Sequence, residues 1–117
     1  MSVATSTELE LIRAAALDYF EGWFDGDAER MNRALHPELV KRRAGDEPGV
    51  VAKEQMVGWT QEGLWKRDAD RAVEVEVSEA YEQIATVIVR STPFREYLHL
   101  VRTDDGWKIA NTLYVRT

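Results

Sequence analysis

The sequence predicts a single α+β domain in which helices cover one face of a strongly curved antiparallel sheet. Its 117 residues match the size of one domain with a hydrophobic core of its own. The first half shows the three- and four-residue apolar spacing of amphipathic helices, and the second half shows the alternation of half-buried strands. Helices followed by a run of strands are typical of this class. No repeat, low-complexity segment or Pro/Gly-rich linker divides the chain.

The first helix is predicted to follow a flexible N-terminal tail at residues 1–6, so that the domain covers residues 7–117. Thr7 and Glu10 have the spacing of a capping box, in which the hydroxyl and the carboxylate each accept a backbone N–H. The helix then carries a wide apolar stripe and ends near Gly26. The stripe consists of Leu9, Ile12, Ala16, Tyr19, Phe20 and Trp23.

Two shorter helices and a strand are predicted next. Asp27 is a suitable N-cap for a second helix that runs to Leu35 and stops before Pro37, because proline disfavours a helical conformation in the preceding residue. A short strand is expected at residues 39–43, and a third helix at residues 53–62.

The rest of the chain predicts strands. Valines alternate with polar residues from Val73 to Ser78, and residues 84–89 are apolar on both faces, as in a central strand. Residues 94–103 and 107–115 are predicted to pair as a hairpin, since Gly106 supplies the positive φ that the connecting turn requires.

Composition and charge exclude several classes of function. The formal net charge of −6 disfavours nucleic acid as a partner, and no apolar run approaches the ~18 residues of a membrane span. There is no secretory signal, so we expect a cytoplasmic protein. The chain has no cysteine and no dinucleotide or phosphate-loop motif, and its two histidines are 63 positions apart, so neither a metal nor a cofactor is predicted. The basic run at residues 41–43 is interpreted as an exposed strand end rather than an anion site.

Two stretches of sequence carry a resemblance to a known family. Residues 17–27 with their continuation at 34–42, and residues 97–100 with 106–111, resemble the superfamily named after nuclear transport factor two. Together the two stretches resemble the branch labelled "putative lumazine-binding", which is polyketide-cyclase-like. The resemblance implies a cystatin-like cone, in which a curved sheet wraps around the helices, with a pocket for a small molecule.

The resemblance also bears on catalysis. Relatives in this superfamily include ketosteroid isomerases, polyketide cyclases and dehydratases, alongside plain binding and dimerisation modules. Tyr19 falls where the isomerases carry a tyrosine that stabilises an oxyanion. Their proton-abstracting carboxylate would fall near residues 41–43, which are basic here, so the isomerase mechanism lacks its base.

His99 and Asn111 are the first candidate catalytic residues. A three-residue turn in the last hairpin sets these two side chains opposite each other, on the same face as Trp107. We expect the helices to cover this face, which directs both polar side chains into the interior. His99 would act there as a base or a hydrogen-bonding anchor with Asn111 fixing its tautomer, or the two would form a structural pair.

Tyr19 is the third candidate catalytic residue, because its position at the edge of the helical stripe lets its hydroxyl reach a cavity. The alternative is a buried tyrosine bonded to a backbone acceptor. Aromatic and apolar side chains are predicted to line the cavity, or else to fill the core. The candidate ligand-binding residues are Trp23, Met56, Trp59, Trp65, Tyr97, Trp107 and Leu113.

Two functions of different classes therefore stay open. One is a pocket protein for a small apolar or ring-bearing ligand, with or without weak acid–base chemistry. The other is a structural or interaction module with a self-filled core. A homodimer is expected through the outer face of the sheet, unless residues 63–71 cover that face or the inner and outer faces are exchanged. The predicted contact residues are Leu98, Leu100, Ala110, Thr112 and Tyr114.

Overall fold

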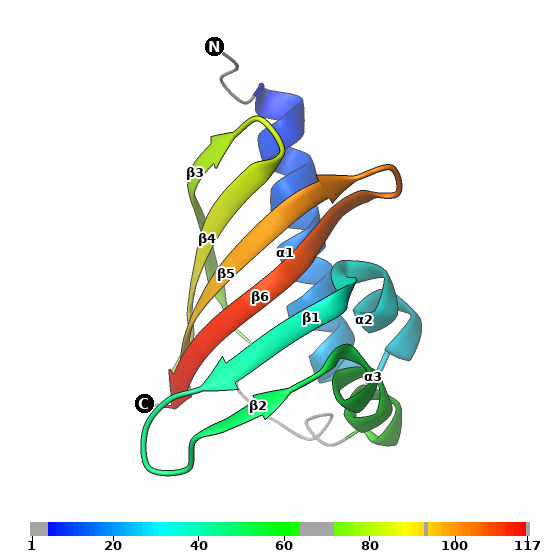
Figure 1. Cartoon of the computed structure of the whole chain (residues 1–117), viewed down its shortest axis with the longest axis vertical. Coiled ribbons are helices and arrows are strands. Elements are labelled where there is room, and N and C mark those ends of the chain that lie inside the picture. Colours follow the sequence, from blue (N-terminus) through cyan, green and yellow to red (C-terminus); the bar gives the residue numbers. More distant parts are fainter. Residues whose placement is uncertain (1–4, 64–71, 93, 117) are drawn as a thin grey trace.

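The computed structural model describes residues 5–63, 72–92 and 94–116, and it confirms the α+β class (Figure 1). The long first helix lies against the concave face of a curved sheet, while α3 packs against β1, and α2 packs against α1, α3 and β6. In chain order the elements are α1 (Ser6–Asp25), α2 (Ala28–Ala34), β1 (Leu35–Arg43), β2 (Gly49–Val51), α3 (Lys53–Glu62), β3 (Glu74–Tyr81), β4 (Ile84–Arg90), β5 (Phe94–Thr103) and β6 (Gly106–Arg116).

The sheet is mixed rather than wholly antiparallel. Its strand order is β2-β1-β6-β5-β4-β3, and β1 runs parallel to β6 while all other neighbours are antiparallel. Strands β3 to β6 form a consecutive meander, which leaves one edge of β6 unpaired. β1 fills that edge, and this brings the N-terminal half of the chain beside the C-terminal strand.

The helix boundaries agree with the sequence except at the start of α1 and at Leu35, which begins β1 instead of ending α2. α1 begins at Ser6, because the Thr5 hydroxyl accepts a hydrogen bond from the backbone N–H of Glu8 at 3.1 Å. The predicted cap at Thr7 is therefore wrong by two residues. The Asp27 cap on α2 is confirmed by its 3.1 Å bond from the N–H of Arg30, and α3 has the predicted limits.

The core lies between α1 and the concave face of the sheet. Buried side chains of α1, including Ile12 and Phe20, belong to the same apolar cluster as the inward residues of β4, β5 and β6. On β5 the buried positions are Glu96, Leu98 and Leu100. No helix in the described ranges combines the length and apolar character that crossing a membrane requires.

A β-bulge sets which residues of the last hairpin face the core. His99 pairs with Asn111 as predicted, but the next pair joins Leu100 to Ile109, so Ala110 is an extra residue in β6. Ile109 therefore faces inward together with Leu100, while Asn111 faces away from the helices. The sequence analysis assumes that inward and outward residues alternate along β6 without a bulge, and it therefore places His99 and Asn111 on the inward face instead of the outer one.

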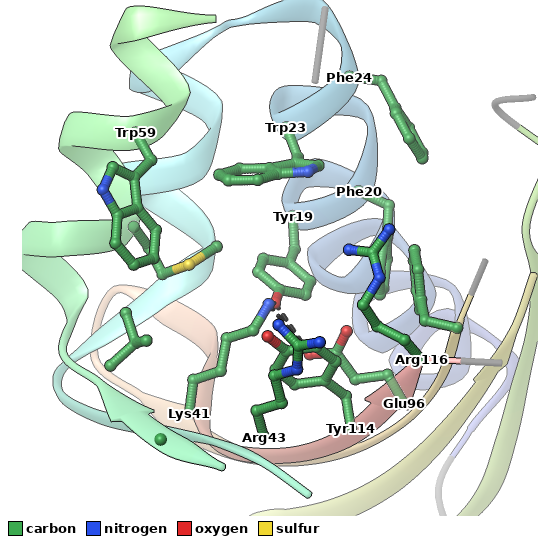
Figure 2. Close-up of a pocket in the computed structure, with 14 residues that line it drawn as sticks. Tyr19, Phe20, Trp23, Phe24, Lys41, Arg43, Trp59, Glu96, Tyr114 and Arg116 are labelled. Carbon is green, nitrogen blue, oxygen red and sulfur yellow. Dashed lines mark hydrogen bonds and ion pairs between the residues drawn. The ribbon is translucent and has the colours of Figure 1, made fainter. Parts of the chain in front are cut away.

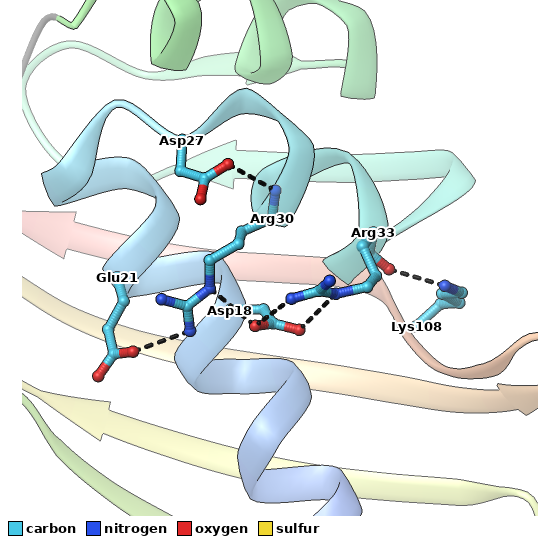
Figure 3. Close-up of polar contacts among 6 residues, drawn as sticks. All are labelled: Asp18, Glu21, Asp27, Arg30, Arg33 and Lys108. Atoms are coloured by element: carbon cyan, nitrogen blue, oxygen red, sulfur yellow. Dashed lines mark hydrogen bonds and ion pairs between the residues drawn. The ribbon is translucent and has the colours of Figure 1, made fainter.

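A network of ion pairs fastens α2 to α1 (Figure 3). The Asp18 carboxylate accepts hydrogen bonds from Arg30 at 2.9 Å and from Arg33 at 3.0 and 3.1 Å. Arg30 also reaches Glu21 at 2.8 Å, and the Lys108 ammonium donates to the Arg33 carbonyl oxygen at 2.8 Å. Each of these charged side chains has a partner within the protein.

Candidate functional site

A cavity of about 340 Å³ lies between the C-terminal half of α1, α3 and the ends of β1, β5 and β6 (Figure 2). Its lining combines aromatic and apolar side chains with four charged ones. The lining residues are Tyr19, Phe20, Trp23, Phe24, Lys41, Arg43, Gly49, Val51, Met56, Trp59, Phe94, Glu96, Tyr114 and Arg116.

The walls of the cavity are largely aromatic. The rings of Phe20 and Phe94 stack with centroids 5.6 Å apart and planes inclined by 15°. Trp23 and Trp59 are half-buried and present parts of their indoles to the space (Figure 2), and the buried Met56 also lines it. A cavity with several flat aromatic faces in its walls suits a ligand with a planar ring.

Three polar side chains meet at the floor of the cavity. The Tyr19 hydroxyl donates to Glu96 Oε2 at 2.8 Å and accepts a hydrogen bond from the Lys41 ammonium. Lys41 Nζ lies 3.6 Å from the same carboxylate oxygen, and it also lies over the rings of Tyr19 and Tyr114, 5.0 and 4.5 Å from their centroids. The side chains of Glu96 and Lys41 are only 2% and 12% exposed, so this is a buried ion pair bridged by a phenol.

The surroundings shift the ionisation of two members of this cluster. Burial, reinforced by the Glu96 charge, raises the pKa of Tyr19 well above its usual value. Burial lowers the pKa of Lys41, and the nearby Glu96 carboxylate offsets only part of that effect. Tyr19 is therefore a persistent hydrogen-bond donor, and the Lys41 amine gives up its proton more readily than a lysine in water.

Strand alternation explains how these residues reach one space. On β1 the side chains of Leu39, Lys41 and Arg43 face inward, while Val40 and Arg42 face solvent. The basic run is thus not simply an exposed strand end, since two of its three cations line the cavity. The spacing of residues 39, 41 and 43 carried this signal, because Leu39 is the apolar residue that fixes the inward phase.

Glu96, like Lys41 and Arg43, is a site residue that sequence reasoning missed. It shares the inward face of β5 with Leu98 and Leu100. The opposite face of this strand also carries apolar residues, at Tyr97 and Val101. Both phases therefore look equally suited to a core, and only the bulge in β6 decides between them.

The predicted site residues separate into those at the cavity and those elsewhere. Tyr19 lines the cavity, and so do Trp23, Met56 and Trp59. Trp65 lies outside the described residues. Trp107 is buried near the start of α1, where its indole N–H donates to Glu8 Oε2 at 3.2 Å. Two others, Tyr97 and Leu113, are 46% and 47% exposed on the outer face of the sheet.

His99 and Asn111 form the predicted pair at the wrong location. Their side chains are 2.9 Å apart, from the imidazole Nδ1 to the amide oxygen, which confirms the hydrogen bond. Both residues are exposed, however, and they border a separate hollow of about 430 Å³ that also touches Tyr81 and Thr86. Their expected position in the interior is wrong, because the bulge at Ala110 changes the phase of β6.

The expected dimer residues also lie elsewhere. Leu98, Leu100 and Thr112 are buried within the subunit, and Tyr114 lines the cavity. Ala110 is the bulge residue and is half-buried. The outer face is instead formed by the alternate residues of the same strands. Among the described residues, no cluster of three or more His, Asp or Glu side chains has the arrangement of a metal site.

Comparison with known proteins agrees with this architecture. The family model described as "Putative lumazine-binding" matches residues 7–115. An NTF2-like protein of unknown function from Silicibacter pomeroyi superposes with a TM-score of 0.79 at 16% identity, over 97% of this chain and 99% of that one. A ketosteroid isomerase-like protein from Erwinia carotovora atroseptica gives a TM-score of 0.72 at 20% identity, over 96% and 98% of the two chains.

A third solved structure, a cystatin-like fold protein from Burkholderia xenovorans, gives a TM-score of 0.69 at 22% identity, over 99% of this chain and 96% of that one. At these identities the likeness concerns the fold. A search of curated proteins found no match.

Proposed function

Because the chain belongs to the family described as "Putative lumazine-binding", we propose that it binds a small ring-bearing molecule in the cavity beside α1 and α3. One observation carries the proposal, namely an aromatic-walled cavity that ends at a single buried polar cluster. Its volume of about 340 Å³ falls within the range of small-molecule sites, roughly 300–1,000 Å³.

The polar floor supports acid–base chemistry on a ligand carbonyl. Lys41 has three N–H donors, of which one bonds to Tyr19 and another faces Glu96 at 3.6 Å. A remaining donor is available to polarise a carbonyl oxygen at the floor. The lowered pKa of Lys41 also favours proton transfer nearer to neutral pH. These two roles belong to different protonation states: the ammonium would polarise the carbonyl, whereas the neutral amine, which the lowered pKa makes more accessible, would provide the base that the isomerase comparison lacked.

A binding titration with a bicyclic aromatic ketone such as 2-tetralone tests the proposal. We expect the ketone to quench tryptophan fluorescence, and Trp59→Ala to weaken its affinity about tenfold by removing one wall. Tyr81→Ala is the matched control, since it removes an exposed aromatic ring that does not line the cavity. Failure of several ring-bearing probes to bind would contradict the proposal.

The chemical step has its own test. In deuterium oxide, we expect the protein to accelerate exchange of the protons beside the ketone carbonyl, as followed by NMR. Lys41→Met should abolish the acceleration, because the base is lost while the aromatic walls remain. Binding without exchange would leave a binding protein and exclude acid–base chemistry on this probe.

A second function, homodimerisation, is supported by the outer face of the sheet. Leu113, Tyr97 and Ile88 lie directly side by side across β6, β5 and β4, and the first two are 47% and 46% exposed. Such a row is self-complementary about a two-fold axis, so one patch serves both subunits. We propose that this row, instead of the buried leucines expected from the sequence, is the centre of the dimer.

Sedimentation equilibrium tests the dimer. At micromolar concentration we expect twice the 13.4 kDa mass of the chain, and Leu113→Asp should give monomers because it would bury an unpaired carboxylate in the contact. Glu79→Asp is a control on the exposed face of β3, away from this row. A wild-type mass near 13.4 kDa would overturn the proposal.

A further inference from the structure

The cationic side of the cavity points to the chemical class of the ligand. We propose that the ligand is a ring-bearing carboxylate and that Arg43 binds its carboxylate group. This inference rests on the proposed binding function and deepens it, because that function alone would fit a neutral ring equally well.

The first argument is the local balance of charge. The chain as a whole is acidic, with a formal net charge of −6. Among the described residues the cavity reverses that sign, because its lining holds three cations and one carboxylate. Lys41 is already paired with that carboxylate, Glu96, at 3.6 Å. Arg43 is paired with Glu47, whose side chain is 81% exposed, so this pair neutralises little of the Arg43 charge and an anion bound beside it would be stabilised.

The second argument is the incomplete bonding of Arg43. Its Nη2 lies 3.6 Å from Glu47, whose side chain is 81% exposed and is held only loosely. Its Nε is buried, and within the described residues it has no hydrogen-bond partner. A buried donor without an acceptor is costly, so native structures seldom leave one unsatisfied. A carboxylate is a suitable acceptor for this guanidinium, because its two oxygens can accept from Nε and an Nη together.

The third argument is the direction of the side chain. Arg43 and Lys41 extend from β1 toward the same space below Tyr19 and Trp23 (Figure 2). A ligand carboxylate on Arg43 would therefore keep the ring among the aromatic walls. The neighbouring Arg42 faces solvent on the other side of the strand. A phosphate dianion fits less well than a carboxylate, because Glu96 shares the cavity and repels added negative charge.

Paired ligands that differ only in charge test this inference. We would titrate the protein with 2-naphthoate and with 2-naphthamide, which have the same ring and nearly the same shape. The wild type should bind the carboxylate at least about tenfold more tightly, as expected for hydrogen bonds between charged groups. Arg43→Gln should remove this preference and leave the amide affinity within about twofold of the wild type.

Matched variants make the outcome specific. Arg42→Gln removes an equal charge from the next position and should keep the preference for the carboxylate. Arg43→Lys should keep part of that preference, since an ammonium retains the charge but not the two parallel N–H donors of the guanidinium. Equal affinity of the wild type for both ligands, or a preference that survives Arg43→Gln, would overturn the carboxylate assignment while leaving ring binding intact. Failure of both ligands to bind would overturn ring binding and the assignment together.

Discussion

Asp18 and Tyr19 are adjacent on α1, yet their side chains enter two polar clusters of different character. Asp18 lies in the network with Arg30 and Arg33, where the charges face one another and the arginines reach the surface (Figure 3). Tyr19 lies at the floor of the cavity, where the Lys41 and Glu96 side chains are almost wholly buried.

The difference separates a structural cluster from a ligand-facing one. In the Asp18 cluster, burial alone would raise the pKa of the carboxyl, but hydrogen bonds and charges from Arg33 and Arg30 outweigh it and hold that pKa below its ordinary value. The protein satisfies this cluster by itself. In the cavity cluster, burial lowers the pKa of Lys41 and so disfavours its charged form. The cluster also adjoins Arg43, whose buried Nε has no hydrogen-bond partner within the described residues. Perturbed pKa values of this kind are often found at functional sites.

The largest predicted effect follows from removing the buried carboxylate. Glu96→Ala leaves Lys41 without its counter-ion and the Tyr19 hydroxyl without its acceptor. We expect a loss of about 3–5 kcal/mol in the free energy of unfolding, measured by urea denaturation. Lys41 can limit the loss by releasing its proton. Combining Glu96→Leu with Lys41→Met should recover much of the stability, because no buried charge is then left without its partner.

Glu76→Ala is the matched control for this prediction. Glu76 pairs with Arg90 at 2.8 Å, but its side chain is 51% exposed, so its loss should cost at most about 1 kcal/mol. Equal costs for the two variants would show that the cavity cluster contributes no more than a surface ion pair, and the comparison between the two regions would fail.

The sequence predicted the elements of the fold well because their signals are local. Helix α3 is set by residues 53–62 alone, and the Asp27 cap depends on contacts three residues away. The parallel pairing of β1 with β6 joins residues about seventy positions apart, and no local pattern reports it. The predicted sheet was therefore wholly antiparallel.

The site was predicted less completely, because it depends on which face of each strand is buried. Tyr19 was found on a helix, where the apolar stripe fixes the inward side. His99 was assigned to the interior because one extra residue at Ala110 reverses the phase of β6. A bulge of this kind depends on tertiary packing, which the local sequence does not report. The sequence therefore identifies the hairpin correctly but exchanges its inward and outer faces at His99 and Asn111. For the same reason it does not identify Glu96 as an inward residue.

An intermediate effect is predicted for Tyr19→Phe, which keeps the ring but removes the hydroxyl that links Lys41 to Glu96. We expect a loss of about 1.5–3 kcal/mol near neutral pH, as for a buried hydrogen bond to a charged group. The pKa of Tyr19 is raised in the folded state, so its contribution is complete below the usual tyrosine pKa of about 10 and is lost as the pH rises further. The difference between the two proteins should therefore narrow in alkaline urea titrations, and a constant difference would contradict the buried position of the phenol.

The smallest effect is predicted for Asp18→Asn, which tests the cluster that the protein satisfies by itself. The amide loses the charge that binds Arg30 and Arg33, and since both arginines are partly exposed we expect a cost of about 1 kcal/mol at neutral pH. The lowered pKa of Asp18 means that its stabilisation is present above the unfolded value of about 4 and is lost as the pH falls through the folded value. Thermal unfolding of the wild type should therefore approach that of the variant in acid. The affinity for 2-naphthoate should stay unchanged, because Asp18 does not line the cavity; a clear loss of affinity would mean that the two clusters are coupled through α1.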